Sequence, residues 1–91
     1  MSTQEKVLPE FAEETDVLSL NEIILYNDDV NTFDYVIETL MDVCEHTQEQ
    51  AHQCSLIVHY KGKCCVKTGT FNELEPRCQQ LLDAGLSAVL V

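Results

Sequence analysis

Residues 22–44, EIILYNDDVNTFDYVIETLMDVC, change their hydrophobic period midway, and this change decides the predicted fold. Residues 22–26 form a short β-branched, aliphatic and aromatic run that stops at Asn27-Asp28-Asp29, as a strand stops at a turn. From residue 31 the apolar residues recur with the spacing of one helical face. They are Phe33, Val36, Ile37, Leu40, Met41 and Cys44. A strand therefore leads into a helix, for which Asn31 is the expected N-cap.

Another helix and two more strands are predicted further along the chain. A capping box from Thr47 to Gln50 starts the helix and Gly62 is placed to end it, although residues 55–60 would also suit a strand. Residues 64–68 and 86–91 are rich in β-forming residues and predict the second and third strands.

The last predicted helix contains a conflict. A capping box from Thr70 to Glu73 starts it and Asp83-Ala84-Gly85 ends it. Pro76 lies between these signals, and an interior proline removes an amide donor at a cost of about 3 kcal/mol. The sequence therefore predicts either a helix that begins at Pro76 or an irregular first turn.

The order β-α-α-β-α-β predicts a small α+β domain with three helices on one face of a three-stranded sheet. Residues 21–91 form this domain. Residues 1–20 are acidic, contain Pro9 and show no sustained apolar period, so they are expected to form a flexible N-terminal arm.

Composition narrows the range of functions. The 91 residues carry a net charge of −11, which disfavours binding to nucleic acid or to an anionic membrane and favours a cationic ligand or a basic protein surface. No stretch is long and apolar enough to span a bilayer or to act as a signal peptide, so we expect a cytoplasmic protein whose five cysteines are thiols. Neither a metal site, a cofactor site nor an enzymatic motif is predicted.

Two features are candidates for a binding site. Asn27-Asp28-Asp29 joins a strand end to a helix start, where acceptors can converge on a small ligand, but the same residues are common in purely structural turns. His59 lies one helical turn after Ser55, on a stripe that can line a pocket, but a single histidine is also common on surfaces and in cores. The residues alone leave both alternatives open.

The segments Ile23–Asp29, Phe33–Ile37 and Val58–Lys63 together resemble the ClpS family of adaptors for the ATP-dependent Clp protease, over about residues 22–91. The resemblance implies three helices packed on a three-stranded antiparallel sheet. It also implies an adaptor that grips the free N-terminal residue of an N-degron substrate and delivers it to a Clp AAA+ unfoldase of the ClpA type.

The resemblance also implies roles for individual residues. Asn27, Asp28, Asp29 and His59 would bind the substrate α-amino group. Asn31, Phe33, Val36, Ser55 and Val58 would line a hydrophobic pocket for a first residue such as Leu, Phe, Tyr or Trp. Asn72 and Arg77 would contact the chaperone.

Some of these positions depart from the family's usual residues. Phe33 replaces a common methionine, Ser55 replaces a larger apolar residue, and Asn31 replaces a threonine. Asn72 stands at a usual glutamate position and Arg77 at a lysine position. The departures at Phe33 and Ser55 suggest an alternative, a regulator that binds the Clp chaperone without recognising N-degrons, whereas those at Asn72 and Arg77 suggest altered docking to the chaperone.

Overall fold

A computed structural model describes residues 20–91 of the chain. Their secondary structure follows the predicted order. The elements are β1 (Asn21–Tyr26), α2 (Phe33–Val43), α3 (Gln48–Lys61), β2 (Lys63–Gly69), α4 (Phe71–Asp83) and β3 (Ser87–Leu90). The predicted α+β class is therefore confirmed, whereas the predicted arm, apart from Leu20, lies outside the described residues.

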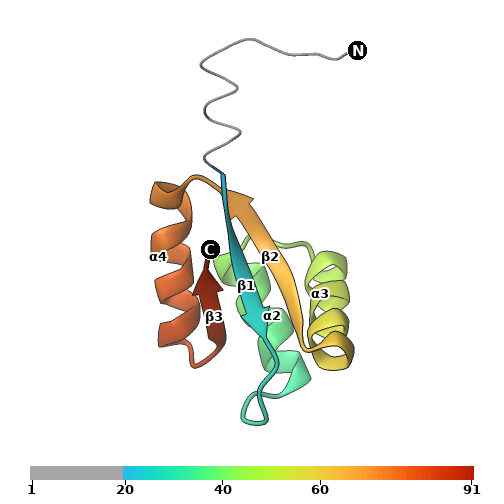
Figure 1. The fold of residues 1–91 in the computed structure, drawn as a ribbon. Helices are drawn as coiled ribbons and strands as arrows, with labels where there is room; N and C mark the ends of the chain where they lie inside the picture. Colours follow the sequence, from blue (N-terminus) through green and yellow to red (C-terminus); the bar gives the residue numbers. More distant parts are fainter. Residues whose placement is uncertain (1–19) are drawn as a thin grey trace, which may run out of the picture.

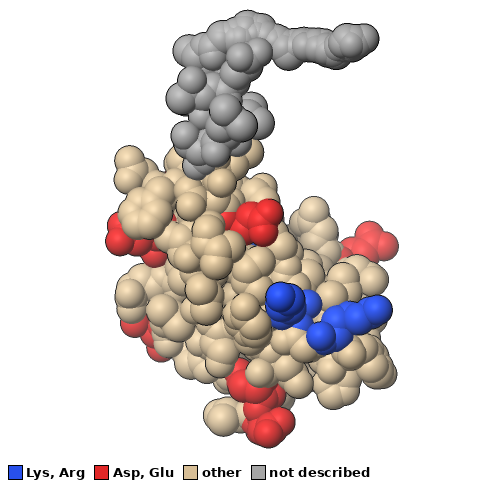
Figure 2. Space-filling model, in the orientation of Figure 1, with Lys and Arg blue, Asp and Glu red and all other residues tan. Residues whose placement is uncertain are grey.

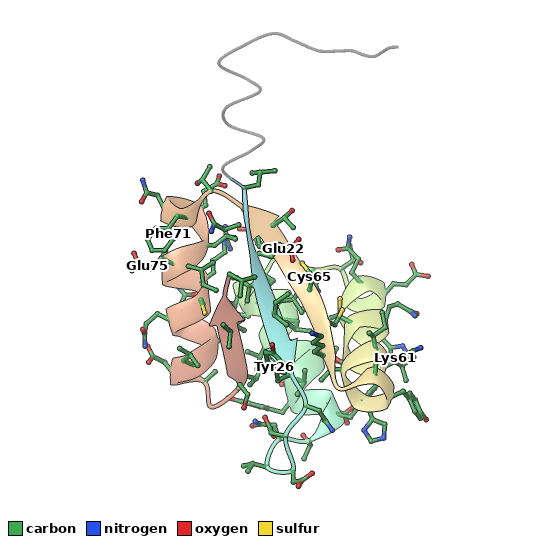
Figure 3. All side chains as sticks on the ribbon, viewed as in Figure 1. Glu22, Tyr26, Lys61, Cys65, Phe71 and Glu75 are labelled. Atoms are coloured by element: carbon green, nitrogen blue, oxygen red, sulfur yellow. The ribbon has the colours of Figure 1, made fainter. Side chains whose placement is uncertain are left out.

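The sheet has the order β2-β1-β3, and both strand pairs are antiparallel. All three helices pack on one side of it, with α2 behind the strands in the view of Figure 1. Along β1, Ile23 and Leu25 are buried beneath the helices. Figure 3 shows Glu22 and Cys65 on the opposite, open face, as expected for side chains that alternate along a strand.

The core lies between the sheet and the helices, and each helix contributes to it. Leu40, Ala51, Leu74 and Leu81 are fully buried. Of the stripe predicted for α2, Leu40 and Cys44 enter this core, whereas Phe33 and Met41 remain 37% and 39% exposed. The helix is rotated so that Thr39 and Val43 are buried as well, and Phe33 faces a cavity described below.

The three helices begin at threonines. Thr47 and Thr70 form the predicted capping boxes with Gln50 and Glu73, which are therefore confirmed. The prediction for α2 was wrong by one residue, because Thr32 rather than Asn31 caps the helix and accepts a hydrogen bond from the Tyr35 amide. The Asn31 side chain instead lies in the loop, where its Nδ2 group donates to Asp28 and to the Gly85 carbonyl.

Pro76 does not interrupt α4. The helix is continuous from Phe71 to Asp83, so neither of the two predicted alternatives is correct. Proline removes the bond that would reach the carbonyl one turn earlier, that of Asn72. Both Asn72 and Pro76 are exposed, and water can therefore solvate the carbonyl that the proline leaves unpaired.

Basic side chains from other elements hold the end of α2, whose own last turn has none. Arg77 of α4 donates from Nη1 to the Val43 carbonyl at 2.6 Å, and Lys67 of β2 donates from Nζ to the Cys44 carbonyl at 3.3 Å. The final carbonyls of a helix lack intrahelical partners and carry the negative end of its dipole. These two cations therefore fix α2 against α4 and β2.

The loop between β1 and α2 is organised around one carboxylate. Asp28 Oδ1 accepts from the amides of Val30 and Asn31, both at 2.9 Å, and its Oδ2 accepts from Asn31 Nδ2 at 3.0 Å. Burial raises the pKa of Asp28, but the hydrogen bonds from Asn31 and Val30 together lower it more, and the net pKa is below 3.8. The ionised carboxylate therefore stabilises the loop.

Two further contacts fix the surroundings of this loop. The Asn27 amide donates to the Gly62 carbonyl at 3.0 Å, where Gly62 ends α3 in the left-handed conformation with φ 94°. On the other side, Tyr35 Oη donates to the Ala84 carbonyl at 2.6 Å. The loop is thus held between the end of α3 and the turn that precedes β3.

Replacing Arg77 with methionine should destabilise the fold, because the Val43 carbonyl loses its charged donor while the apolar stem is retained. We expect a loss of about 1–3 kcal/mol in the free energy of unfolding, measured by urea denaturation. Glu45→Gln is the matched control, since it removes only the partly exposed 3.3 Å ion pair with Arg77. Its cost should lie below about 1 kcal/mol. An equal loss of unfolding free energy in the two variants would show that Arg77 stabilises the fold through its ion pair with Glu45 and not through its bond to the end of α2.

Replacing Asp28 with asparagine should destabilise the protein in a pH-dependent way. Because the folded-state pKa is depressed, the carboxylate contributes its full stabilisation above the ordinary value of 3.8 and loses it as the pH falls through the folded-state pKa. The stability gap between the wild type and Asp28→Asn should therefore be constant near neutral pH and shrink in acid below 3.8. Denaturant titrations across this range measure it, and a gap that widens in acid would contradict the assignment.

Candidate functional site

One cavity of about 440 Å³ opens where the end of β1, the loop after it, the start of α2 and the end of α3 meet. This volume lies within the range of about 300–1,000 Å³ typical of small-molecule sites. All nine residues predicted to bind a ligand line the cavity. They are Asn27, Asp28, Asp29, Asn31, Phe33, Val36, Ser55, Val58 and His59. The tertiary structure therefore brings together residues that the sequence places in two separate segments.

One side of the cavity is a polar corner. Asn27, Asp29 and His59 are exposed side chains, and Asp28 is half-buried between them and its own loop. Figure 2 shows acidic side chains at the lower tip of the molecule, where Figure 1 places the loop between β1 and α2. Carboxylate, amide oxygen and neutral imidazole are all acceptors. The corner is therefore suited to a cationic donor.

The His59 ring is positioned by its neighbour. It packs edge-on against the Tyr60 ring, with ring centroids 4.9 Å apart and an interplanar angle of 79°. Gly62 ends the helix three residues later and accepts the hydrogen bond from the Asn27 amide. This bond holds the start of the loop at the C-terminal end of α3, within one turn of His59, and both Asn27 and His59 line the cavity.

The opposite side of the cavity is apolar. Val58 is buried at 6% exposure, Val36 is half-buried, and Phe33 is more exposed and contacts the His52 ring edge-on at 5.5 Å. The remaining lining residues were not predicted. They are Leu25, Tyr26, Leu56, Tyr60 and Leu86. Leu56 and Tyr60 flank the predicted α3 positions, but only the sheet register and the turn at Gly85 bring Leu25 and Leu86 to the cavity.

Asn72 and Arg77 lie away from the cavity, on α4. Asn72 is exposed in the first turn of that helix. Arg77 is already engaged with the end of α2 through the Val43 carbonyl and Glu45. Figure 3 shows that the neighbouring Phe71 and Glu75 point outward from the side of α4 that is remote from α3.

The cysteines and histidines form no metal-binding group with one another or with the described carboxylates of residues 20–91. Among residues 20–91, no three His, Cys, Asp or Glu side chains are placed to hold a metal ion. Burial raises the pKa of Cys44 to about 11 and that of Cys54 to about 12, so both remain protonated thiols near neutral pH. No helix in the described part of the chain is long and apolar enough to cross a membrane.

Comparison with known sequences gives a consistent family. The family model described as "ATP-dependent Clp protease adaptor protein ClpS" matches residues 18–89. The ClpS adapter of Thermosynechococcus vestitus is 38% identical over 66 residues, which cover 71% of this chain and 70% of the relative. That of Campylobacter jejuni is 48% identical over 40 residues, so the match spans only 42% of the relative's length and 44% of this chain.

Comparison with solved structures supports the fold. Agrobacterium tumefaciens ClpS2, solved bound to L-phenylalaninamide, superposes with a TM-score of 0.76 at 19% sequence identity. The superposition covers 80% of this chain and 95% of that protein. The family model matches most of this chain, and the β-α-α-β-α-β fold is also that of the Agrobacterium relative. This chain therefore belongs to the ClpS family of ATP-dependent Clp protease adaptors.

Proposed function

We propose that this protein is a non-enzymatic, cytoplasmic adaptor that binds the free N-terminal residue of N-degron substrates and delivers them to a ClpA-type AAA+ unfoldase. One observation carries the proposal: the acceptors of Asn27, Asp28 and His59 share a cavity with the apolar side chains of Val36 and Val58. A polypeptide start offers the complementary pair, a cationic amine next to a side chain.

The α-ammonium group has three donors and needs several acceptors at one point. Asn27 Oδ1 and a neutral nitrogen of His59 supply two of them. Asp28 acts mainly through its charge, because its carboxylate oxygens already accept hydrogen bonds from Val30 and Asn31. Asp29, exposed beside it, adds to the negative field or binds backbone amides of the substrate.

The first side chain would be buried against the apolar wall. Burial of a side chain such as Leu or Phe is worth about 1.5–3 kcal/mol, and each charged hydrogen bond adds about 1.5–3 kcal/mol net. Loss of translational and rotational freedom offsets much of this sum, which leaves affinities on the order of micromolar. The L-phenylalaninamide bound by the Agrobacterium relative has the same two parts, a free amine and an aromatic side chain.

Delivery requires a second surface. We assign it to the exposed start of α4, where Asn72 and Phe71 face outward. Arg77 contributes here with the part of its side chain, 29% exposed, that its contacts with α2 leave accessible. Residues 21–91 thus carry both surfaces, and residues 1–20 are assigned to the hand-over of the substrate to the unfoldase.

A peptide that begins with a free Leu or Phe should bind, and its N-acetylated form should not. Acetylation removes the positive charge and two of the three donors, which should weaken binding more than about 100-fold. Fluorescence anisotropy with a labelled peptide measures both affinities. Equal binding of the two forms would exclude amine recognition. Unfoldase binding without any peptide binding would instead support a chaperone-binding regulator, the alternative that Phe33 and Ser55 suggest.

Replacing His59 with alanine should weaken binding of the free peptide about 10-fold to 100-fold, since one acceptor for the ammonium is lost. His59→Gln is the matched variant, because it keeps an acceptor oxygen on a side chain of similar length, and it should retain part of the affinity. Fluorescence anisotropy with the free peptide measures both variants, and wild-type affinity in His59→Ala would refute the role of the imidazole as an acceptor.

A further inference from the structure

Ser55 has a buried hydroxyl group without a partner. The residue is 3% exposed in the middle of α3, and its Oγ makes no hydrogen bond with any atom of residues 20–91. His46 Nδ1 is in the same situation, but His46 does not line the cavity, whereas Ser55 does. Ser55 is therefore the one cavity-lining residue in the described part of the chain that combines burial with an unpaired side-chain polar atom.

An unpaired buried hydroxyl is unfavourable for folding. Serine inside a helix usually bonds to the carbonyl one turn earlier or points to water. The Ser55 hydroxyl does neither, so its hydration is already lost in the folded protein without compensation. A ligand group that bonds to it would pair a polar atom that the folded protein leaves unpaired.

Ser55 lies too far from the polar corner to contact the amine of a ligand held there, so only the ligand's side chain could reach it. Ser55 lies one helical turn before His59, about 6 Å along the helix axis. A ligand whose amine is held at the polar corner would place its side chain in the part of the cavity that Phe33, Val36 and Ser55 line. Rotation about χ1 between staggered positions can carry Oγ into the cavity that the residue lines.

The chemistry of a hydroxyl group defines the preferred partner. It can donate and accept at once, so it pairs best with a group that also does both. Among aromatic side chains, tyrosine carries such a group at its far end. Phenylalanine has the same ring without it and would leave Oγ unpaired.

We propose that Ser55 is a specificity-determining residue that hydrogen bonds to the phenol of an N-terminal tyrosine and makes this protein prefer tyrosine over phenylalanine. This inference rests on the proposed recognition of free N-termini and names the side chain that the same cavity selects.

Three peptides that differ only in their first residue test the proposal: tyrosine, phenylalanine and 4-methylphenylalanine. The last matches tyrosine in size but cannot form hydrogen bonds. Fluorescence anisotropy should show that the wild type binds the tyrosine peptide about twofold to tenfold more tightly than either other peptide. In Ser55→Ala this ratio should fall to about one. Gln53→Ala, an exposed substitution on the same helix outside the cavity, should keep the wild-type ratio.

The outcomes distinguish failure of the Ser55 role from failure of amine recognition. Amine recognition stands if free peptides bind better than acetylated ones. The role of Ser55 is then refuted if the wild type shows no tyrosine preference, or if Ser55→Ala keeps that preference. If acetylation has no effect on binding, the proposed function fails and the inference fails with it.

Thermal unfolding provides a readout that does not depend on any ligand. Ser55→Ala removes an unpaired buried hydroxyl and introduces a stronger helix former, so its melting temperature should rise by about 4–8 °C. Gln53→Ala also gains helix propensity but relieves no buried polar atom, and it should change the melting temperature less. A melting temperature lowered in Ser55→Ala would show that the hydroxyl is paired within the protein, which would overturn the proposal.

Discussion

The hydrogen bond from the Asn27 amide to the Gly62 carbonyl links the two segments of the chain that line the cavity. It forms where β1 leaves the sheet and where α3 ends, and Tyr26 pairs with Lys63 directly beside it. A left-handed residue is needed to end α3 at this point, and Gly62 adopts that conformation without steric cost. Without this junction, the loop acceptors and the imidazole of His59 would belong to separate surfaces.

The loop itself shows why an acidic turn can be structural and functional at once. The Asp28 carboxylate accepts hydrogen bonds from the amides of Val30 and Asn31, and it keeps its negative charge while doing so. Asn31 extends the network to the Gly85 carbonyl and so ties the loop to the turn before β3. The acceptors at the cavity are therefore largely preorganised, which reduces the entropy that a ligand would otherwise lose in ordering them.

The cavity itself departs from an ideal folded core. Phe33 is part of an apolar stripe that should be buried, yet it stays partly exposed at the cavity. Ser55 is polar and should be exposed or paired, yet it is buried and unpaired. Local rules that fail together at one cavity are typical of a site whose residues serve a ligand rather than stability alone.

The sequence by itself determined the elements, because the signals for them are local. The threonine caps at Thr47 and Thr70, the glycines that end α3 and α4, and the changes of hydrophobic period all act within a few residues. Family resemblance then supplied the cavity residues. Only the tertiary structure decided that Arg77 and Lys67 hold the end of α2, that Thr32 replaces Asn31 as the cap, and that Leu25 and Leu86 complete the cavity. The bonds of Arg77 and Lys67 to the end of α2, and of Asn31 to the Gly85 carbonyl, join residues distant in the chain. They depend on strand register and helix packing, which no local pattern encodes.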